Sequence, residues 1–180
     1  MGALVVTAQM TIDGVLDSIE HWFHPDEHSD RQGLEQLAAA DALLLGRKTF
    51  EGLRGHWIDK PGDGGWASLV NAIPKYVVSR TLTGTLDWNA TLLTGELAES
   101  VRAVKAEHNL LSYGMGELAH QLATQGIADE FRFWVHPAVW GGDGERPFAG
   151  LGLVSFDLMS STTFASGITL DCYRPIPAGK

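Results

Sequence analysis

The stretch Ala42-Leu43-Leu44-Leu45-Gly46-Arg47-Lys48-Thr49-Phe50 decides the fold class of this chain. Its first four residues are uniformly apolar, as in a strand that is buried on both faces of a parallel sheet. A glycine and a polar segment follow directly, which predicts a tight turn into a helix whose N-terminus favours anions. Ligands of open α/β sheets bind at such strand ends, so this turn is also a candidate site.

The same alternation of apolar runs and amphipathic segments continues on both sides of this stretch. Upstream, residues 3–8 predict a first strand, and Ser29-Asp30-Arg31-Gln32 predicts the capping box of a helix. Downstream, strands are predicted at 76–78, 92–93 and 110–113, and helices over 96–107 and from Leu118 to Gly126. The glycine- and proline-rich segment from Arg54 to Gly65 predicts a loop.

The C-terminal part has a different texture. Apolar and polar residues alternate over 131–136, and two further strand-like runs meet at Ala165-Ser166-Gly167, which predicts an antiparallel hairpin. We therefore expect an α/β fold of three α/β/α layers, with a mixed, mostly parallel central sheet that ends in this hairpin. The 180 residues, 44% of them hydrophobic, suffice for a single domain over 1–180.

Charge and cysteine usage restrict the partners. Lys and Arg number 13 against 22 Asp and Glu, a formal net charge of −9, which repels nucleic acid and anionic membranes. The single cysteine, Cys172, cannot form an internal disulfide, and we expect an inert core residue. The start of the chain lacks the pattern of a signal peptide, and no apolar run reaches the roughly 18 residues of a membrane span, so we expect a cytoplasmic protein.

Three strand ends carry residues suited to a phosphorylated cofactor. The first offers Gly46, Arg47 and Thr49, and the second offers Ser79, Arg80 and Thr81, where an arginine could pair with a 2′-phosphate. The third, Gly114-Met115-Gly116-Glu117, lets a pyrophosphate approach the backbone amides at a helix start. Each alone has an ordinary alternative: a surface ion pair at Arg47, a polar loop, a two-glycine turn. The three together favour a dinucleotide site.

A rival site lies in the segment 21–28, where His21, His24 and His28 neighbour two carboxylates and could in principle bind zinc. Pro25 breaks the helical spacing that would align the imidazoles, and no cysteine lies nearby. We therefore expect no metal.

In order, these features resemble the dihydrofolate-reductase-like family, and within it the branch of the C-terminal reductase domain of the bifunctional riboflavin-biosynthesis protein. The resemblance spans nearly the whole chain and rests on five blocks: residues 11–14 (TIDG), 44–50 (LLGRKTF), 74–82 (PKYVVSRTL), 113–118 (YGMGEL), and 129–131 with 136–137 (DEF, HP). It implies NADPH as cofactor, with Gly46, Arg47 and Thr49 at its phosphates. It also implies Ser79, Arg80 and Thr81 near the 2′-phosphate and Gly114, Met115, Gly116 and Glu117 at the pyrophosphate.

The resemblance further implies an oxidoreductase that transfers a hydride from NADPH to a small pyrimidine- or pterin-like heterocycle, and a homodimer paired through the C-terminal strands. Asp30 is the first candidate for the catalytic acid and Asp26 the second. Alternatively, the Asp30 carboxylate only interacts favourably with the positive end of the helix dipole. Asp13, before Gly14, is a turn-former or a catalytic group. The alternative function is a non-catalytic NADPH-binding or sensor protein on the same fold.

Overall fold

The computed structural model describes residues 2–62 and 64–176, and the chain divides into two compact units. Among the described residues, 2–4 and 33–113 form the first unit, and 5–32 and 114–176 form the second. The assignment of the chain to one domain stays a prediction.

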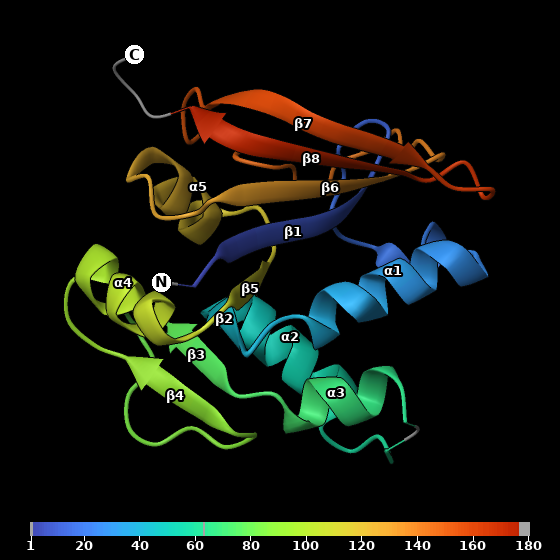
Figure 1. Ribbon diagram of the computed structural model, residues 1–180. Coiled ribbons are helices and arrows are strands. Elements are labelled where there is room, and N and C mark those ends of the chain that lie inside the picture. The colour runs from blue at the N-terminus through green and yellow to red at the C-terminus, as the bar shows by residue number, and fades with distance from the viewer. Residues whose placement is uncertain (1, 63, 177–180) are drawn as a thin grey trace. The chain divides into compact units, whose positions relative to one another are not determined.

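The first unit contains four parallel strands in the order β4-β3-β2-β5; in Figure 1 β2 is teal, β3 green, β4 yellow-green and β5 dark yellow. Their bounds are Ala42–Gly46 for β2, Lys75–Val78 for β3, Ala90–Leu93 for β4 and Leu110–Tyr113 for β5. The four residues 42–45 are buried, as a strand with neighbours on both faces requires. Three helices accompany the strands: α2 (Arg47–Trp57), α3 (Trp66–Ala72) and α4 (Leu97–Glu107), of which α2 packs against β2 and β3.

The segment between β2 and β3 corrects the prediction of a loop from Arg54 to Gly65. The helix that begins at Arg47 continues to Trp57, and α3 follows without having been predicted. Phe50 on α2 and Val70 on α3 are buried, so tertiary packing outweighs the poor helix propensity of the glycines in this segment.

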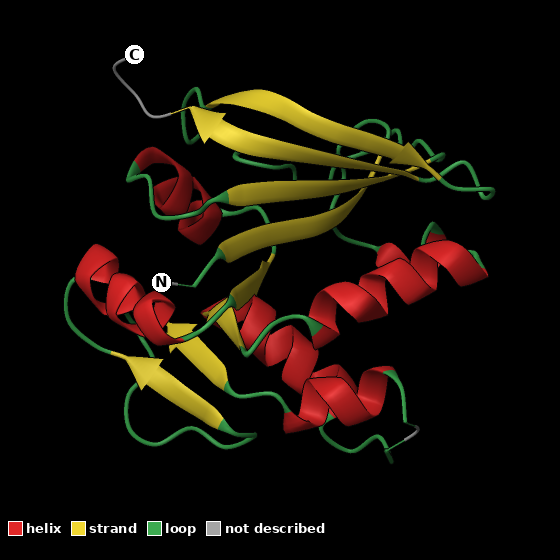
Figure 2. Cartoon of the chain, in the orientation of Figure 1, coloured by secondary structure: helices red, strands yellow, loops and turns green. Residues whose placement is uncertain are grey.

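The second unit contains strands in the order β1-β6-β8-β7, of which β1 and β6 are parallel and the later pairs antiparallel. Their bounds are Leu4–Thr11 for β1, Glu130–His136 for β6, Ser155–Thr163 for β7 and Thr169–Ile176 for β8, with a short helix η1 at Ile19–His21 and α5 at Glu117–Thr124. The predicted C-terminal hairpin is confirmed, and Figure 2 shows it as two long yellow arrows. No helix among the described residues has the length and apolar character to cross a bilayer.

Helix α1 (Glu27–Ala38) is capped three residues before the predicted cap at Ser29. The Asp26 carboxylate accepts the Ser29 amide at 2.8 Å, and the Ser29 hydroxyl oxygen accepts the Asp26 amide at 2.9 Å. This reciprocal arrangement is a capping box, so the box is formed by Asp26 and Ser29 rather than by Ser29 and Gln32. Asp and Ser are both good N-cap residues, and the sequence pattern does not choose between the two frames.

Aromatic side chains fill one side of the second unit's strands. Phe131 is fully buried, and its ring lies 5.1 Å from that of Phe156 and 6.1 Å from that of Phe148. Because side chains alternate along a strand, the neighbouring β6 residues Trp134 and His136 belong to the opposite face. That second face carries polar groups, among them the His136 ring.

Candidate functional site

The carboxyl ends of β2 and β3 lie side by side in the first unit. Gly46 pairs with Val78 in the parallel register, so the turn at Arg47 and the turn at Ser79 leave the strands at the same edge. Two of the three predicted cofactor segments are thus neighbours. Gly46 is the N-cap of α2, with no side-chain hydrogen bond to the first turn, and that turn contains no acidic residue. The amides there and the helix dipole are therefore available to an anion.

Arg47 and Thr49 both lie in the first turn of α2. Arg47 is exposed and its Nη1 lies 3.2 Å from the Glu51 carboxylate one turn later, which is the surface ion pair considered as the ordinary alternative. Such a pair contributes about 0–1 kcal/mol, so a phosphate with more charge would compete for the guanidinium. Thr49 is half-buried on the same turn.

Ser79 organises the second turn. Its Oγ accepts the Thr81 amide at 3.1 Å and the Leu82 amide at 3.0 Å, which folds the chain back immediately after β3. This leaves Arg80 and Thr81 exposed on the turn. Ser79 therefore stabilises the turn, and Arg80 is the charged side chain on its exposed side.

The third predicted segment belongs to the second unit. Gly114 has φ 97°, a conformation that favours glycine, and its amide donates to the Thr7 carbonyl at 2.9 Å. Met115 is buried, and Gly116 is the N-cap of α5 with no side-chain cap and no atom within 4 Å of an added Cβ. The backbone at Gly116 is therefore approachable. The Glu117 carboxylate in the first turn opposes an anion, so only its amide suits a pyrophosphate.

The two predicted acids occupy different positions at the start of α1. Asp26 is the capping residue, and its second carboxylate oxygen accepts the Ser166 amide at 2.8 Å. These hydrogen bonds, from Ser29 first and Ser166 second, lower the pKa of Asp26 below its ordinary value. A carboxylate held ionised in this way is a poor proton donor at neutral pH. Asp30 lies one turn further along and is half-buried.

Asp13 is a turn-former that also anchors a distant loop. Its carboxylate accepts the Thr11 hydroxyl at 2.6 Å and the amides of Trp140 and Gly141 at 3.0 Å each. The same bonds, with that from Thr11 the largest, lower its pKa. The Arg146 guanidinium donates to the Asp13 carbonyl at 3.3 Å. The carboxylate thereby fixes the loop after β6 to the turn after β1.

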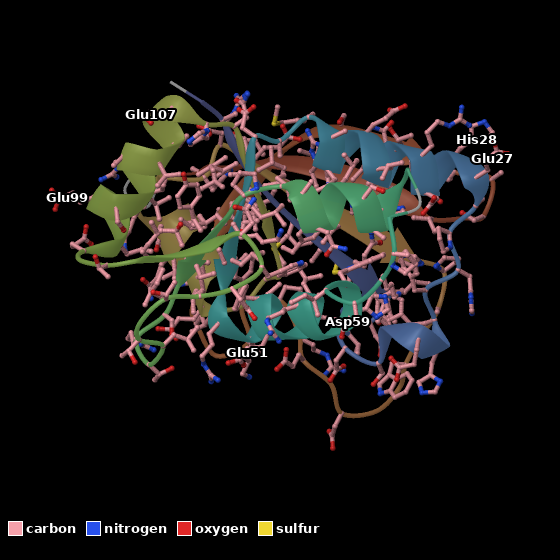
Figure 3. All side chains as sticks on the ribbon, turned by 90° about the horizontal axis from the view of Figure 1, so that it is seen from below. Glu27, His28, Glu51, Asp59, Glu99 and Glu107 are labelled. Atoms are coloured by element: carbon pink, nitrogen blue, oxygen red, sulfur yellow. The ribbon has the colours of Figure 1, made fainter. Side chains whose placement is uncertain are left out.

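The histidine-rich segment shows separate side chains. His21 stacks on Trp140 with ring centroids 5.7 Å apart, and Figure 3 shows Glu27 and His28 at the outer edge of α1. Within residues 2–62 and 64–176, no three His, Cys, Asp or Glu side chains are grouped as metal ligands.

Comparison with known families identifies the chain. The RibD C-terminal domain family matches residues 3–170, almost the whole length. The chain belongs to this family. Membership supports the predicted oxidoreductase class, and the resemblance drawn from the five sequence blocks is confirmed.

A sequence relative and several solved structures are similar to this family member over most of its length. An uncharacterised Bacillus subtilis protein, YyaP, is 28% identical, with 95% of this chain and 94% of that protein covered. A putative riboflavin biosynthesis protein from Shewanella sp. PV-4 superimposes with a TM-score of 0.73 at 20% identity, covering 97% of this chain and 99% of the other. A pyrimidine reductase-like protein from Corynebacterium diphtheriae gives 0.67 at 14% identity, with coverages of 97% and 92%. RibD from Acinetobacter baumannii gives 0.66 at 12%, with 98% of this chain and 58% of that one. The predicted fold class is confirmed.

The sequence prediction missed a polar group on the second face of β1 and β6. The predicted first strand stopped at Ala8, whereas β1 continues to Thr11 and includes Gln9. The Gln9 Oε1 atom lies 2.7 Å from Nε2 of His136, which is 127 residues away in the sequence. The alternation of Thr7, Gln9 and Thr11 was the available signal, because polar side chains at every second position mark one face of a strand.

Proposed function

We propose that this chain is an NADPH-dependent reductase that transfers a hydride to a small pyrimidine- or pterin-like heterocycle, in the riboflavin-biosynthesis branch of its family. The observation that carries the proposal is the shared edge of β2 and β3. There an uncapped helix start and an exposed arginine follow neighbouring parallel strands. Both are suited to phosphate groups.

Each unit by itself carries groups suited to a phosphate. In the first unit, the amides after Gly46 and the side chains of Arg47 and Thr49 would bind phosphate, and Arg80 would bind the 2′-phosphate. In the second unit, the open backbone at Gly116 would bind the pyrophosphate through amides. When bound, NADPH supplies the hydride, while the protein supplies position and a proton. Asp30 is the better placed acid, since Asp26 is committed to capping α1.

A non-catalytic NADPH-binding or sensor protein is the second candidate. The lowered pKa of Asp26 favours the sensor, because an ionised Asp26 does not donate a proton. Of the two predicted acids, only Asp30 then remains as a proton donor. Substitution of Asp30 by asparagine, with NADPH affinity as the control, separates the two. Loss of turnover at unchanged affinity supports the reductase.

The cofactor and the reaction are tested separately. NADPH and NADH are titrated by fluorescence, and NADPH oxidation at 340 nm is then followed with aminopyrimidine and pterin substrates. Tighter binding of NADPH than NADH, followed by oxidation with one substrate class, is the expected result. Equal affinities would contradict the NADPH assignment, and tight binding without oxidation by any substrate would favour the sensor.

We further propose a homodimer paired through the C-terminal strands. In the order β1-β6-β8-β7, strand β7 is at the edge, and its Leu158 and Met159 are 58% and 47% exposed. An exposed edge strand with apolar side chains favours pairing with another chain. Light scattering coupled to size exclusion measures the mass, and a dimer that becomes a monomer on Leu158→Lys is expected.

A further inference from the structure

Three polar side chains in the second unit share one face of β1 and β6. Thr7 and Gln9 are two residues apart on β1, and Gln9 pairs with Trp134 in the parallel register. Side chains two residues apart on a strand point the same way, and paired residues of parallel strands share a face. Thr7, Gln9 and Trp134 therefore line the same side.

Two of these groups lack a hydrogen-bond partner among the described residues. The Thr7 hydroxyl, on a residue 2% exposed, and the Trp134 indole nitrogen, on a residue also 2% exposed, are both unsatisfied. Most buried polar atoms in proteins are paired, and an orphan costs about 1–3 kcal/mol. One orphan lies two residues from Gln9 on β1 and the other belongs to its register partner on β6, where the Trp134 ring stacks on Phe164 with centroids 5.6 Å apart; together they point to a polar molecule beside Gln9.

The Gln9 side chain is held in one orientation. Because its Oε1 lies 2.7 Å from the His136 Nε2 atom and a carbonyl oxygen only accepts, the imidazole donates from Nε2. His136 is 1% exposed and packs against the rings of Trp22 and Phe23, with centroids 5.1 and 5.2 Å away. Burial, with a smaller contribution from His24, lowers the pKa of His136 to about 4, which keeps the ring neutral. The Gln9 NH2 group is thereby turned away from the histidine.

We infer that Gln9, positioned by His136, is a specificity-determining residue that donates its side-chain amide to a carbonyl oxygen of the heterocyclic substrate. This inference rests on the proposed function and deepens it. Among pyrimidine and pterin rings, the Gln9 amide selects those that present a ring carbonyl, rather than an amino group, to it. Thr7 lies beside the contact, and its hydroxyl can donate or accept, which suits the ring N–H next to such a carbonyl.

The donor character of the Gln9 amide gives the test a direction. Uracil presents carbonyl oxygens where 2,4-diaminopyrimidine presents amino groups, so the two rings have similar shape and opposite hydrogen-bonding character. A Gln9→Glu variant replaces the NH2 by an oxygen and keeps an acceptor for His136. Wild type should bind uracil more tightly than 2,4-diaminopyrimidine, and Gln9→Glu should reverse the preference by at least about tenfold.

The experiment titrates both rings into ¹⁵N-labelled protein, with and without NADPH, and follows the side-chain amide resonances of glutamine. The Gln9 pair is assigned by its loss in Gln9→Glu, and Gln32→Glu, an exposed glutamine of α1, is the matched control. Uracil should shift the Gln9 amide in wild type and in the control. His136→Phe keeps an aromatic ring against Trp22 and removes the donor; it should weaken uracil binding while the NADPH affinity is unchanged.

Each outcome is decisive for Gln9 independently of the reductase proposal. A shift of the Gln9 amide and the reversed preference support the inference, even if no NADPH oxidation is found. An unshifted Gln9 amide at saturating uracil, absence of uracil binding, or an unchanged preference in Gln9→Glu overturns it, even if NADPH is oxidised with another substrate. A His136→Phe variant that weakens NADPH and uracil equally would assign His136 a structural role only.

Discussion

Replacement of Lys75 by methionine tests how the first unit tolerates a buried charge. Lys75 begins β3 and is 1% exposed. Its Nζ donates to the Ile73 carbonyl at 2.7 Å and the Asn71 carbonyl at 3.4 Å, and lies 4.1 Å from the centroid of the Trp88 ring. Burial lowers the pKa of Lys75 from 10.5 to about 8.

The sign and size of the effect follow from proton linkage. Between the folded and unfolded pKa values the unfolded chain holds a proton that the folded chain has released, so the free energy of unfolding rises with pH. Applied to pKa values of 8 and 10.5, linkage gives at most about 2.5 kcal/mol between roughly pH 7 and 10. The Trp88 ring stabilises the ammonium by roughly 0.5–2 kcal/mol, which reduces the shift. We expect a rise of about 0.5–2 kcal/mol.

Urea unfolding of wild type and Lys75→Met across this pH range isolates the contribution, because other titrating groups cancel in the difference. Lys60→Met is the control for loss of an exposed lysine of the same unit; its Nζ lies 2.6 Å from His56 Nε2 and 4.5 Å from the centroid of the Trp57 ring. The difference between wild type and Lys75→Met should grow in favour of wild type as the pH rises. A difference in unfolding free energy that does not change with pH would refute this reasoning. It would show that the two carbonyls and the Trp88 ring compensate fully for burial of the ammonium.

Arg80→Ala should weaken NADPH by about ten- to a hundredfold and leave NADH almost unchanged, because a charge-assisted phosphate contact contributes roughly 1.5–3 kcal/mol; an unchanged ratio of dissociation constants would exclude Arg80 and direct attention to Arg47. Wild type should lose stability as the pH falls below the ordinary aspartate pKa, since hydrogen bonds lower that of Asp26; Asp26→Asn should lose less, and equal acid melting curves would disprove the capping role. Phe131→Ala should cost about 3–5 kcal/mol in urea unfolding because it empties a fully buried site, whereas a cost under about 1 kcal/mol would mean that the neighbouring rings collapse into it.

The order of strands and helices could largely be predicted from local patterns. The apolar run at 42–45 is buried as β2, and the alternation over 131–136 is strand β6, because hydrophobic periodicity reflects which faces lose contact with water. Local pattern failed where tertiary contacts outweigh propensity. Helix α2 continues through Arg54-Gly55-His56-Trp57. Helix α1 is capped by Asp26, whose carboxylate also accepts the Ser166 amide from the β7–β8 turn.

The sequence by itself determined the net charge of −9, the family, and the turns at Gly46, Ser79 and Gly114; the family and the turns depend on residue types at short spacing. Only the tertiary structure decided that Gly46 and Val78 are register neighbours, and that Gln9 meets His136 across 127 residues of sequence. Long-range strand pairing sets the register and the face on which each side chain lies. The spacing of residues along the sequence does not reveal that pairing. For the same reason the tertiary structure alone showed Asp26 as a helix cap and Asp13 as the anchor of a loop.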